Sequence, residues 1–231
     1  MLRNLAKRSR EHEIMDAGID DFAMFDDSLR QIETVNRLTL GYRPVLSWLG
    51  AQMSAKTFLS VLDIGSGRGG LLRGIYALAK RKGAAVDLAG IDIAPWSAAA
   101  ASKATPGEMR IDYRVNDVFR SDITADYIVC SHTTHHMTDA ELVALIRWME
   151  DHARRGWLID DLHRHIIPYV FVKILLAFAP VNAMVRNDAA VSVARAFTRR
   201  EWQALLDAAG VTAEIRWHFP FRYGVARLKD D

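Results

Sequence analysis

The sequence is poor in the residues that covalent cross-links, cysteine-bound zinc or strong charge require. Only one of its 231 residues is a cysteine, Cys130, which excludes an internal disulfide and a cysteine-based zinc site. The 30 basic and 28 acidic residues leave a formal net charge of +2. A protein that binds nucleic acid without sequence preference usually needs a larger positive surplus. We therefore expect no nucleic-acid partner, and a reducing, cytoplasmic location.

Long hydrophobic runs are also missing, although 50% of the residues are hydrophobic. The apolar segment 166–181 is shorter than the roughly 20 residues that cross a bilayer, and Lys173 interrupts it. The basic residues near the N-terminus are not followed by an apolar stretch, so they do not form a secretory signal. The composition predicts no stable membrane span and one substantial folded core.

Two regions with different patterns follow one another along the chain. Residues 1–56 show helical spacing of hydrophobic residues and no strand pattern, so we expect an N-terminal helical cap. In residues 57–231, short apolar strands alternate with helical segments at the pitch of βαβ units. This alternation predicts an α/β fold with a Rossmann-like doubly wound sheet. The expected strands are 57–64, 86–91, 110–115, 126–130 and 156–159, and the expected helices are 69–82, 95–103 and 139–152.

The end of the chain predicts an antiparallel pair of strands. A helix is expected over residues 199–209, because Thr198 and Glu201 form a capping box. The strand-like stretches 212–219 and 221–228 lie too close together for a crossover helix, so they must pair antiparallel. We therefore expect seven strands, of which the last is antiparallel.

Residues 163–196 interrupt the alternating pattern and are expected to form a helical insertion. The apolar segment 166–181 within it has three possible roles: a buried helix, a lid over an apolar ligand, or a membrane-contacting surface. As a lid, its residues Phe171, Leu175 and Phe178 would share one helix face.

A glycine-rich loop between a strand and a helix is the first candidate binding site. Gly65, Gly67 and Gly70 satisfy the pattern G-x-G-x-x-G, in which glycines allow a tight turn and a close approach to a ligand. A dinucleotide would place its pyrophosphate at the helix N-terminus, where Asp63 would repel it. S-adenosylmethionine instead carries an ammonium and a sulfonium and no phosphate. A nicotinamide-dependent oxidoreductase shares the glycine pattern and is the alternative.

The stretch Val61–Gly69 resembles the first motif of the class I S-adenosylmethionine-dependent methyltransferases. Asp92 ends the second strand, where the family's acidic residue binds both ribose hydroxyls, and Asp117 follows the third strand beside the adenine position. From the residues alone, Asp92 is also a good helix cap and Asp117 an ordinary turn residue. The resemblance implies S-adenosyl-L-methionine as the cofactor. The residues that it implies for binding are Asp63, Gly65, Ser66, Gly67, Asp92, Ile93, Asp117, Val118 and Ser131.

Three histidines follow the fourth strand, whose carboxyl end faces the ligand crevice of an open α/β sheet. A hydroxyl acceptor benefits from a general base, which is most often histidine. We predict His135 and His136 as catalytic residues and His132 as a substrate-binding residue. A structural role and a metal site with Asp160 or Asp161 are the alternatives.

A closer resemblance is to small-molecule methyltransferases found beside polyketide-type biosynthesis enzymes. The residues on which this resemblance rests are the pair His135-His136, the pair Asp161-Leu162 and the stretch Ser192–Thr198. This likeness implies O-methylation of a phenolic or polyketide-derived acceptor in secondary metabolism. Catechol-type methyltransferases have acidic metal ligands where this chain has histidines, so we expect no metal.

The remaining predictions concern the acceptor and the class of reaction. His163 and Arg164 follow the fifth strand and are predicted to bind the acceptor, which we expect to be small and aromatic or apolar. No Asn-Pro-Pro-Tyr-like motif follows the fourth strand, which argues against methylation of amides or base amino groups. A carbon or nitrogen acceptor, a non-catalytic cofactor-binding module and a homodimeric state stay open.

Overall fold

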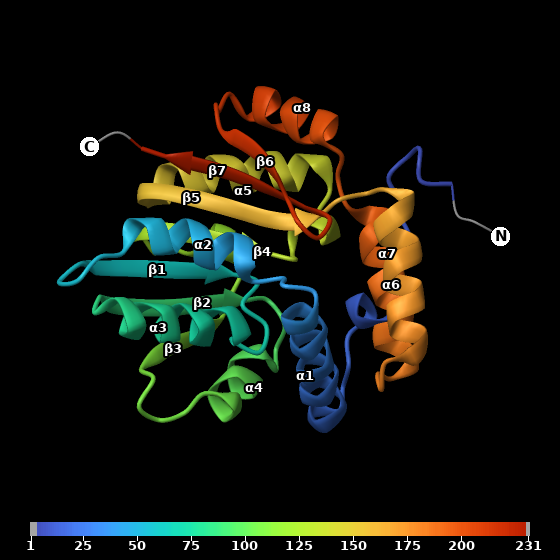
Figure 1. Cartoon of the computed structure of the whole chain (residues 1–231), viewed down its shortest axis with the longest axis horizontal. Helices are drawn as coiled ribbons and strands as arrows, with labels where there is room; N and C mark the ends of the chain where they lie inside the picture. Colours follow the sequence, from blue (N-terminus) through green and yellow to red (C-terminus); the bar gives the residue numbers. More distant parts are fainter. Residues whose placement is uncertain (1–3, 230–231) are drawn as a thin grey trace.

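Seven strands form one sheet in the computed structural model, which describes residues 4–229 (Figure 1). Their order is β3-β2-β1-β4-β5-β7-β6, and only β7 runs antiparallel to its neighbours. The predicted doubly wound sheet with an antiparallel last strand is confirmed. The strands are β1 (Phe58–Ile64), β2 (Ala85–Asp92), β3 (Ile111–Val115), β4 (Ala125–Ser131), β5 (Ala153–Leu162), β6 (Glu214–His218) and β7 (Arg222–Leu228).

Helices cover both faces of this sheet. The side chains of β1 alternate between two hydrophobic clusters, with Leu59 and Val61 on one face and Leu62 and Ile64 on the other. Helices α2 and α3 pack on the first face, and α5 and α8 pack on the second. The helices are α1 (Phe22–Leu38), α2 (Arg43–Gln52), α3 (Gly70–Lys82), α4 (Ser97–Ala104), α5 (Asp139–His152), α6 (Ile166–Phe178), α7 (Ala183–Arg195) and α8 (Arg199–Ala209).

Capping residues explain which helix bounds agree with those predicted from the sequence. The starts of α5 and α8 are as predicted, because Thr138 with Glu141 and Thr198 with Glu201 form reciprocal capping boxes. Helix α4 starts two residues later than expected, at Ser97 rather than at residue 95. The fifth strand is longer than the expected 156–159, because it continues to pair with β7 through Leu162.

The insertion contains two helices, where only one apolar segment was expected. Helix α6 ends at Phe178, and α7 begins after Asn182, whose side chain caps it by accepting from Val185 N–H at 2.8 Å. No described helix has both the length and the apolar character that crossing a membrane requires.

Three helices stand beyond the carboxyl ends of the parallel strands (Figure 1). These are α1, α6 and α7, together with the short 3-10 helix η1 (Ile14–Ala17). Asp188 of α7 accepts hydrogen bonds from the backbone N–H groups of Ile14 and Met15, at 2.9 and 3.1 Å. The N-terminal segment is thereby attached to the insertion, on the edge of the sheet where open α/β folds bind their ligands.

Candidate active site

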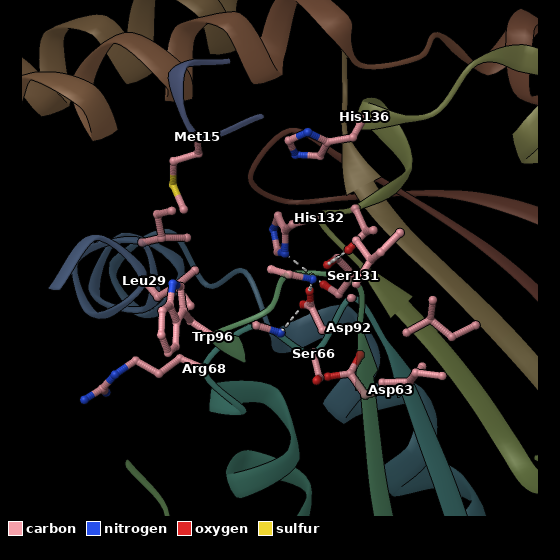
Figure 2. Close-up of a pocket in the computed structure, with 18 of the residues that line it drawn as sticks. Met15, Leu29, Asp63, Ser66, Arg68, Asp92, Trp96, Ser131, His132 and His136 are labelled. Carbon is pink, nitrogen blue, oxygen red and sulfur yellow. Dashed lines mark hydrogen bonds between the residues drawn. The ribbon is translucent and has the colours of Figure 1, made fainter. Parts of the chain in front are cut away.

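A cavity of about 820 Å³ lies at the carboxyl ends of β1, β2 and β4. Figure 2 shows Met15, Leu29 and Trp96 on one side of it, with Asp92, Ser131 and His132 on the other. The volume is within the range of cofactor pockets. All residues predicted to bind the cofactor line this cavity, namely Asp63, Gly65, Ser66, Gly67, Asp92, Ile93, Asp117, Val118 and Ser131.

The glycine loop of this cavity has a backbone conformation and close contacts that a residue with a Cβ atom would disrupt. Gly65 has a φ of +72°, and a Cβ atom there would lie 2.2 Å from Oγ1 of Thr133. Gly69 has a φ of +75°, and a Cβ atom would lie 2.2 Å from the hydroxyl of Tyr113. The loop therefore fits closely against β3 and the segment after β4, and its own backbone forms part of the cavity wall.

Two carboxyl groups lie at the floor of the cavity. Asp92 accepts from the backbone N–H groups of Gly67 and Ala94, at 2.8 and 2.9 Å, so it joins the glycine loop to the turn after β2. Asp63 is buried, and burial together with the charge of Asp92 raises its pKa well above the usual range. Neither group forms an ion pair within residues 4–229. Two adjacent acids without a cationic partner suit a ligand that carries positive charge and hydroxyl groups.

Asp117 lies at the far end of the same cavity. Its Oδ1 accepts from the backbone N–H of Phe119 at 3.0 Å, which makes it the cap of the short 3-10 helix η2 (Val118–Arg120). Val118 is buried beside it, whereas Ile93 is 74% exposed. This part of the cavity thus combines a hydrogen-bond acceptor with two apolar side chains.

Helix α1 forms a wall of the cavity, as expected of the N-terminal helices, but through residues that the sequence did not single out. Arg68 of the glycine loop donates to Asp26 at 2.6 Å and to Glu33 at 3.3 Å, and Arg73 also donates to Glu33, at 2.8 Å. These contacts hold the helix against the loop. They also neutralise Arg68, the one cation in the loop. The available signal was the spacing of Asp26 and Glu33, which are seven residues apart and share one helix face.

A second cavity, of about 160 Å³, lies between α1, α6, α7 and the loop before β7. Its lining includes Pro168, Phe171, Val172, Val185, Val193 and Phe221. The two spaces share five lining residues and meet there, namely Glu13, Ile32, Asn36, His132 and His136.

His135 is buried at this junction, in the short 3-10 helix η3 (Thr134–His136). Its Nδ1 lies 2.8 Å from Oδ1 of Asp161, and its Nε2 lies 3.5 Å from Oε1 of Glu13. Burial alone would lower its pKa, but the charge and hydrogen bond of Asp161 and the carboxylate of Glu13 raise the pKa to about 10. At this pKa, His135 is protonated at neutral pH and does not act as a base.

His136 faces the cavities more openly, with 34% of its side chain exposed. Its Nδ1 lies 2.7 Å from Oδ1 of Asp16, and its Nε2 lies 3.7 Å from Oε2 of Glu13. The two histidine rings lie 4.3 Å apart between centroids. Both predicted catalytic histidines are thus adjacent, but only His136 lines both cavities.

The stretch Ser192–Thr198 supports this histidine pair from α7. Arg195 donates to the backbone carbonyls of His135 and His136, at 3.0 and 3.1 Å, and its Nη1 pairs with Asp16. Ser192 donates to Oε1 of Glu13 at 2.7 Å. The three sequence elements that carry the closer resemblance therefore meet at one place in the structure.

His132 lies beside Ser131 (Figure 2) and also contacts Arg222. Its Nδ1 is 2.8 Å from Oγ of Ser131, and its Nε2 contacts Nη1 of Arg222. Burial and the positive charge of Arg222 hold its pKa well below the usual range. The ring is therefore neutral, and it divides the larger cavity from the apolar pocket.

His163 and Arg164, predicted to bind the acceptor, line neither cavity. The Arg164 guanidinium is buried and donates to the backbone carbonyls of Leu5 and Ala196 and to Glu201, at 3.1, 2.6 and 2.6 Å. His163 packs against the rings of His165 and Tyr223. Both residues connect parts of the chain, and we do not place them in the acceptor site.

Comparison with known proteins agrees with this geometry. Residues 41–214 match a family model described as a methyltransferase domain. No curated protein sequence matches the chain significantly. Human N-acetylserotonin methyltransferase, solved with S-adenosylmethionine, is a structural neighbour with a TM-score of 0.66 and 16% identity over 95% of this chain and 60% of that chain.

Two further neighbours are similar over most of both chains. Magnesium protoporphyrin IX methyltransferase from Synechocystis PCC 6803, solved with S-adenosylhomocysteine, has a TM-score of 0.58 and 17% identity over 92% of this chain and 90% of that one. The plantazolicin methyltransferase BpumL has a TM-score of 0.59 and 15% identity over 91% and 88%. At such identities the likeness establishes a shared fold. The family match confirms the predicted membership: the chain belongs to the methyltransferase domain family, within the class I S-adenosylmethionine-dependent methyltransferases.

Proposed function

We propose that the protein transfers a methyl group from S-adenosylmethionine to a hydroxyl of a small aromatic or polyketide-derived acceptor. The observation that carries this proposal is the meeting of a carboxylate-lined cavity and an apolar pocket at a junction that includes Glu13, His132 and His136. When bound, S-adenosylmethionine supplies an electrophilic methyl group on a sulfonium. The protein's main task is then to align this group with the acceptor oxygen.

The residues of the larger cavity suit each part of this donor. Asp92 keeps free lone pairs on both oxygens after accepting from Gly67 and Ala94, so it can accept from ribose hydroxyls. Asp63 suits an ammonium group, because a cation beside it would favour the ionised carboxylate and offset the burial that raises its pKa. Asp117 offers Oδ2 to an amino group, because its Oδ1 is used within the turn. A pyrophosphate would meet two acids here, which disfavours the nicotinamide-dependent alternative.

The apolar pocket suits the acceptor. Phe171 of α6 and Phe221 of the loop before β7 form part of its wall, with ring centroids 5.7 Å apart. An aromatic ring placed there would direct a hydroxyl toward His136 and Glu13, which are among the polar groups shared with the larger cavity. The neighbours act on substrates as different as N-acetylserotonin and magnesium protoporphyrin IX, so the fold alone does not select the acceptor.

We assign different roles to the two histidines. His136 contacts both cavities and is the catalytic residue at which the acceptor hydroxyl loses its proton. His135 is a positioning residue, because Asp161 and Glu13 hold it from both sides and its ring packs on His136. A cytoplasmic location, a homodimer and a place in secondary metabolism belong to the same proposal.

Isothermal titration calorimetry and a screen of phenolic acceptors test this function together. We expect the protein to bind S-adenosylhomocysteine at one site per chain and to methylate at least one phenol, as detected by a mass increase of one methyl group. Binding without transfer to any acceptor would favour a non-catalytic module. Binding of NADH in place of S-adenosylhomocysteine would overturn the proposal in favour of an oxidoreductase.

A further inference from the structure

The side chains of Glu13, His135 and His136 present three ligand atoms to one point between the cavities. These atoms all lie within 4.8 Å of one another. The Nε2 atoms of the two histidines lie 3.5 and 3.7 Å from the two carboxylate oxygens of Glu13. Ligands at about 2.0 to 2.1 Å from a tetrahedral ion are about 3.4 Å apart. Both histidine–carboxylate separations are therefore within a few tenths of an ångström of the value in such a site.

Both imidazoles have the outer hydrogen bonds that metal-binding histidines usually have. Nδ1 of His135 lies 2.8 Å from Asp161, and Nδ1 of His136 lies 2.7 Å from Asp16. A carboxylate at Nδ1 fixes the tautomer that carries its proton there, which leaves the lone pair of Nε2 for a metal ion. In both rings it is Nε2 that faces Glu13.

The supporting carboxylates are themselves held in place. Asp161 accepts from the hydroxyl of Thr134 at 2.5 Å and from the backbone N–H of His135 at 2.9 Å. Ser192 fixes Glu13 by donating to Oε1. The donor atoms are therefore positioned by contacts from η3, β5 and α7, and the site does not depend on mobile surface side chains.

Negative charge surrounds the two imidazoles, which favours a cation at this point. Three carboxylates contact them, those of Glu13, Asp16 and Asp161. Arg195 pairs with Asp16 and balances one of the three negative charges. The other two, on Glu13 and Asp161, face the histidine rings and favour positive charge there, either the proton on His135 or a metal ion in its place.

We infer that Glu13, His135 and His136 bind a divalent transition-metal ion, with zinc the best match to two imidazoles and one carboxylate. Three protein ligands leave at least one coordination position open, as in catalytic zinc sites. Because Glu13 and His136 line both cavities, the open position faces the place where the proposed acceptor hydroxyl lies.

This placement deepens the proposed function and rests on it. An ion held by Glu13, His135 and His136 would make a hydroxyl bound to it more acidic, because it would stabilise the conjugate base. The O–H bond breaks and the proton passes to solvent. The oxygen keeps the electron pair and forms the new bond to the methyl carbon, while the carbon–sulfur bond breaks and its electron pair stays on sulfur. With the ion bound, His136 would serve the same proton loss as a ligand of the ion; without the ion, His136 itself would accept the proton.

Cobalt(II) titration of the whole metal-free protein tests the inference without reference to activity. The protein is stripped with a chelator, desalted and titrated with Co²⁺ while the visible absorption is recorded. We expect one Co²⁺ per chain, with the intense visible bands of a tetrahedral N/O site. We expect Zn²⁺ to abolish the signal by displacing Co²⁺.

Three variants assign the signal to these residues. Glu13→Gln keeps the shape of the side chain but removes its charge, and His136→Ala removes an imidazole that is partly exposed. Each should weaken Co²⁺ binding at least about 10-fold. The matched control is His152→Ala, whose ring stacks on Trp148 away from the cavities and whose loss should leave binding unchanged.

Absence of stoichiometric Co²⁺ uptake by the wild-type protein would overturn the inference, and so would uptake that is equal in all three variants. The cluster would then be an ion pair between a protonated His135 and its two carboxylates. S-adenosylhomocysteine binding is measured on the same samples. Cofactor binding without Co²⁺ uptake overturns only the metal site, whereas Co²⁺ uptake without cofactor binding overturns only the proposed function.

Discussion

The two halves of the cleft are built in different ways. The cofactor half consists of the glycine loop and the ends of β1, β2 and β3, and each of its parts follows a strand within a few residues. The acceptor half joins segments that are far apart in the chain. Glu13 comes from before α1, His135 and His136 from after β4, and Ser192 and Arg195 from α7.

This difference separates specificity for the cofactor from specificity for the acceptor. The cofactor half is made of backbone turns and of carboxylates at strand ends. Few substitutions are compatible with it, because most of them would alter the conformation of the glycine loop. The acceptor half is attached to the sheet by η1, α6 and α7, which lie outside the βαβ core. We expect damage in one half to leave the other half's function nearly intact, and the following predictions test that separation.

The largest effect is expected in the acceptor half. His136→Ala should lower turnover by about 10²- to 10⁴-fold, because it removes the group at which the acceptor loses its proton. The dissociation constant for S-adenosylhomocysteine should change less than about 3-fold. Steady-state kinetics and calorimetry on the same preparation measure both, with His152→Ala as the control. A parallel loss of cofactor affinity would break the distinction between the halves.

The next effect belongs to the cofactor half. Asp92→Ala removes the acceptor for the backbone N–H groups of Gly67 and Ala94, along with the proposed ribose contact. A hydrogen bond to a charged group contributes about 1.5 to 3 kcal/mol, so S-adenosylhomocysteine affinity should fall roughly 10- to 150-fold. Asp112→Ala, at an exposed ion pair with Arg114, is the control. Unchanged affinity in Asp92→Ala would exclude the predicted role of this residue.

A smaller effect should follow from filling the apolar pocket. Ala189→Phe adds an aromatic ring to its lining, which should raise the KM for the acceptor about 10-fold and leave cofactor affinity unchanged. Ala183→Phe, on an exposed position of the same helix, is the matched control. Equal KM values for both variants would place the acceptor elsewhere.

The smallest effect concerns the attachment of α1 to the glycine loop. Burial alone would raise the pKa of Asp26, but hydrogen bonds from Arg68 and Lys103 and their charges lower it below the usual value. The resulting stabilisation is present above the unfolded-state pKa of about 3.9 and is lost as the pH falls through the lower folded-state value. Asp26→Asn should therefore flatten the loss of stability below about pH 4.

Urea unfolding at several pH values measures this change, and the free energy of unfolding at neutral pH should fall by roughly 1 to 3 kcal/mol. The neighbouring Asp27→Asn changes an exposed pair with Arg30 and should cost less than about 1 kcal/mol. Equal losses in the two variants would mean that the Arg68 contact does not hold the helix.

The same comparison explains what the sequence could predict. Local signals located the sheet, the glycine loop, Asp92, the start of α5 and the capping box of α8, because each depends on residues within a few positions of one another. Helix α7 was missed because it is buried on several sides and lacks a clear polar face. Arg164 follows β5 as a ligand-binding residue would, yet its guanidinium turns away from the cavities toward Leu5, Ala196 and Glu201.

The composition of the histidine cluster depended on contacts that no local pattern reveals. The sequence placed His135 and His136 at the strand end but did not connect them with Glu13, which lies 122 positions before His135. The pairing requires η1 to return over η3, and that return is fixed by Asp188 and Ser192 of α7. The one available hint was the resemblance carried by Ser192–Thr198.

A crystal structure with S-adenosylhomocysteine soaked into the protein tests the central claim most directly, namely that the carboxylates beside the glycine loop receive a cationic methyl donor. We predict that the ribose hydroxyls lie against Asp92, the ammonium on the side of Asp63 and the sulfur toward His132 and His136. A cleft that stays empty under these conditions, or one that takes up the pyrophosphate of NADH at the glycine loop, would contradict the account.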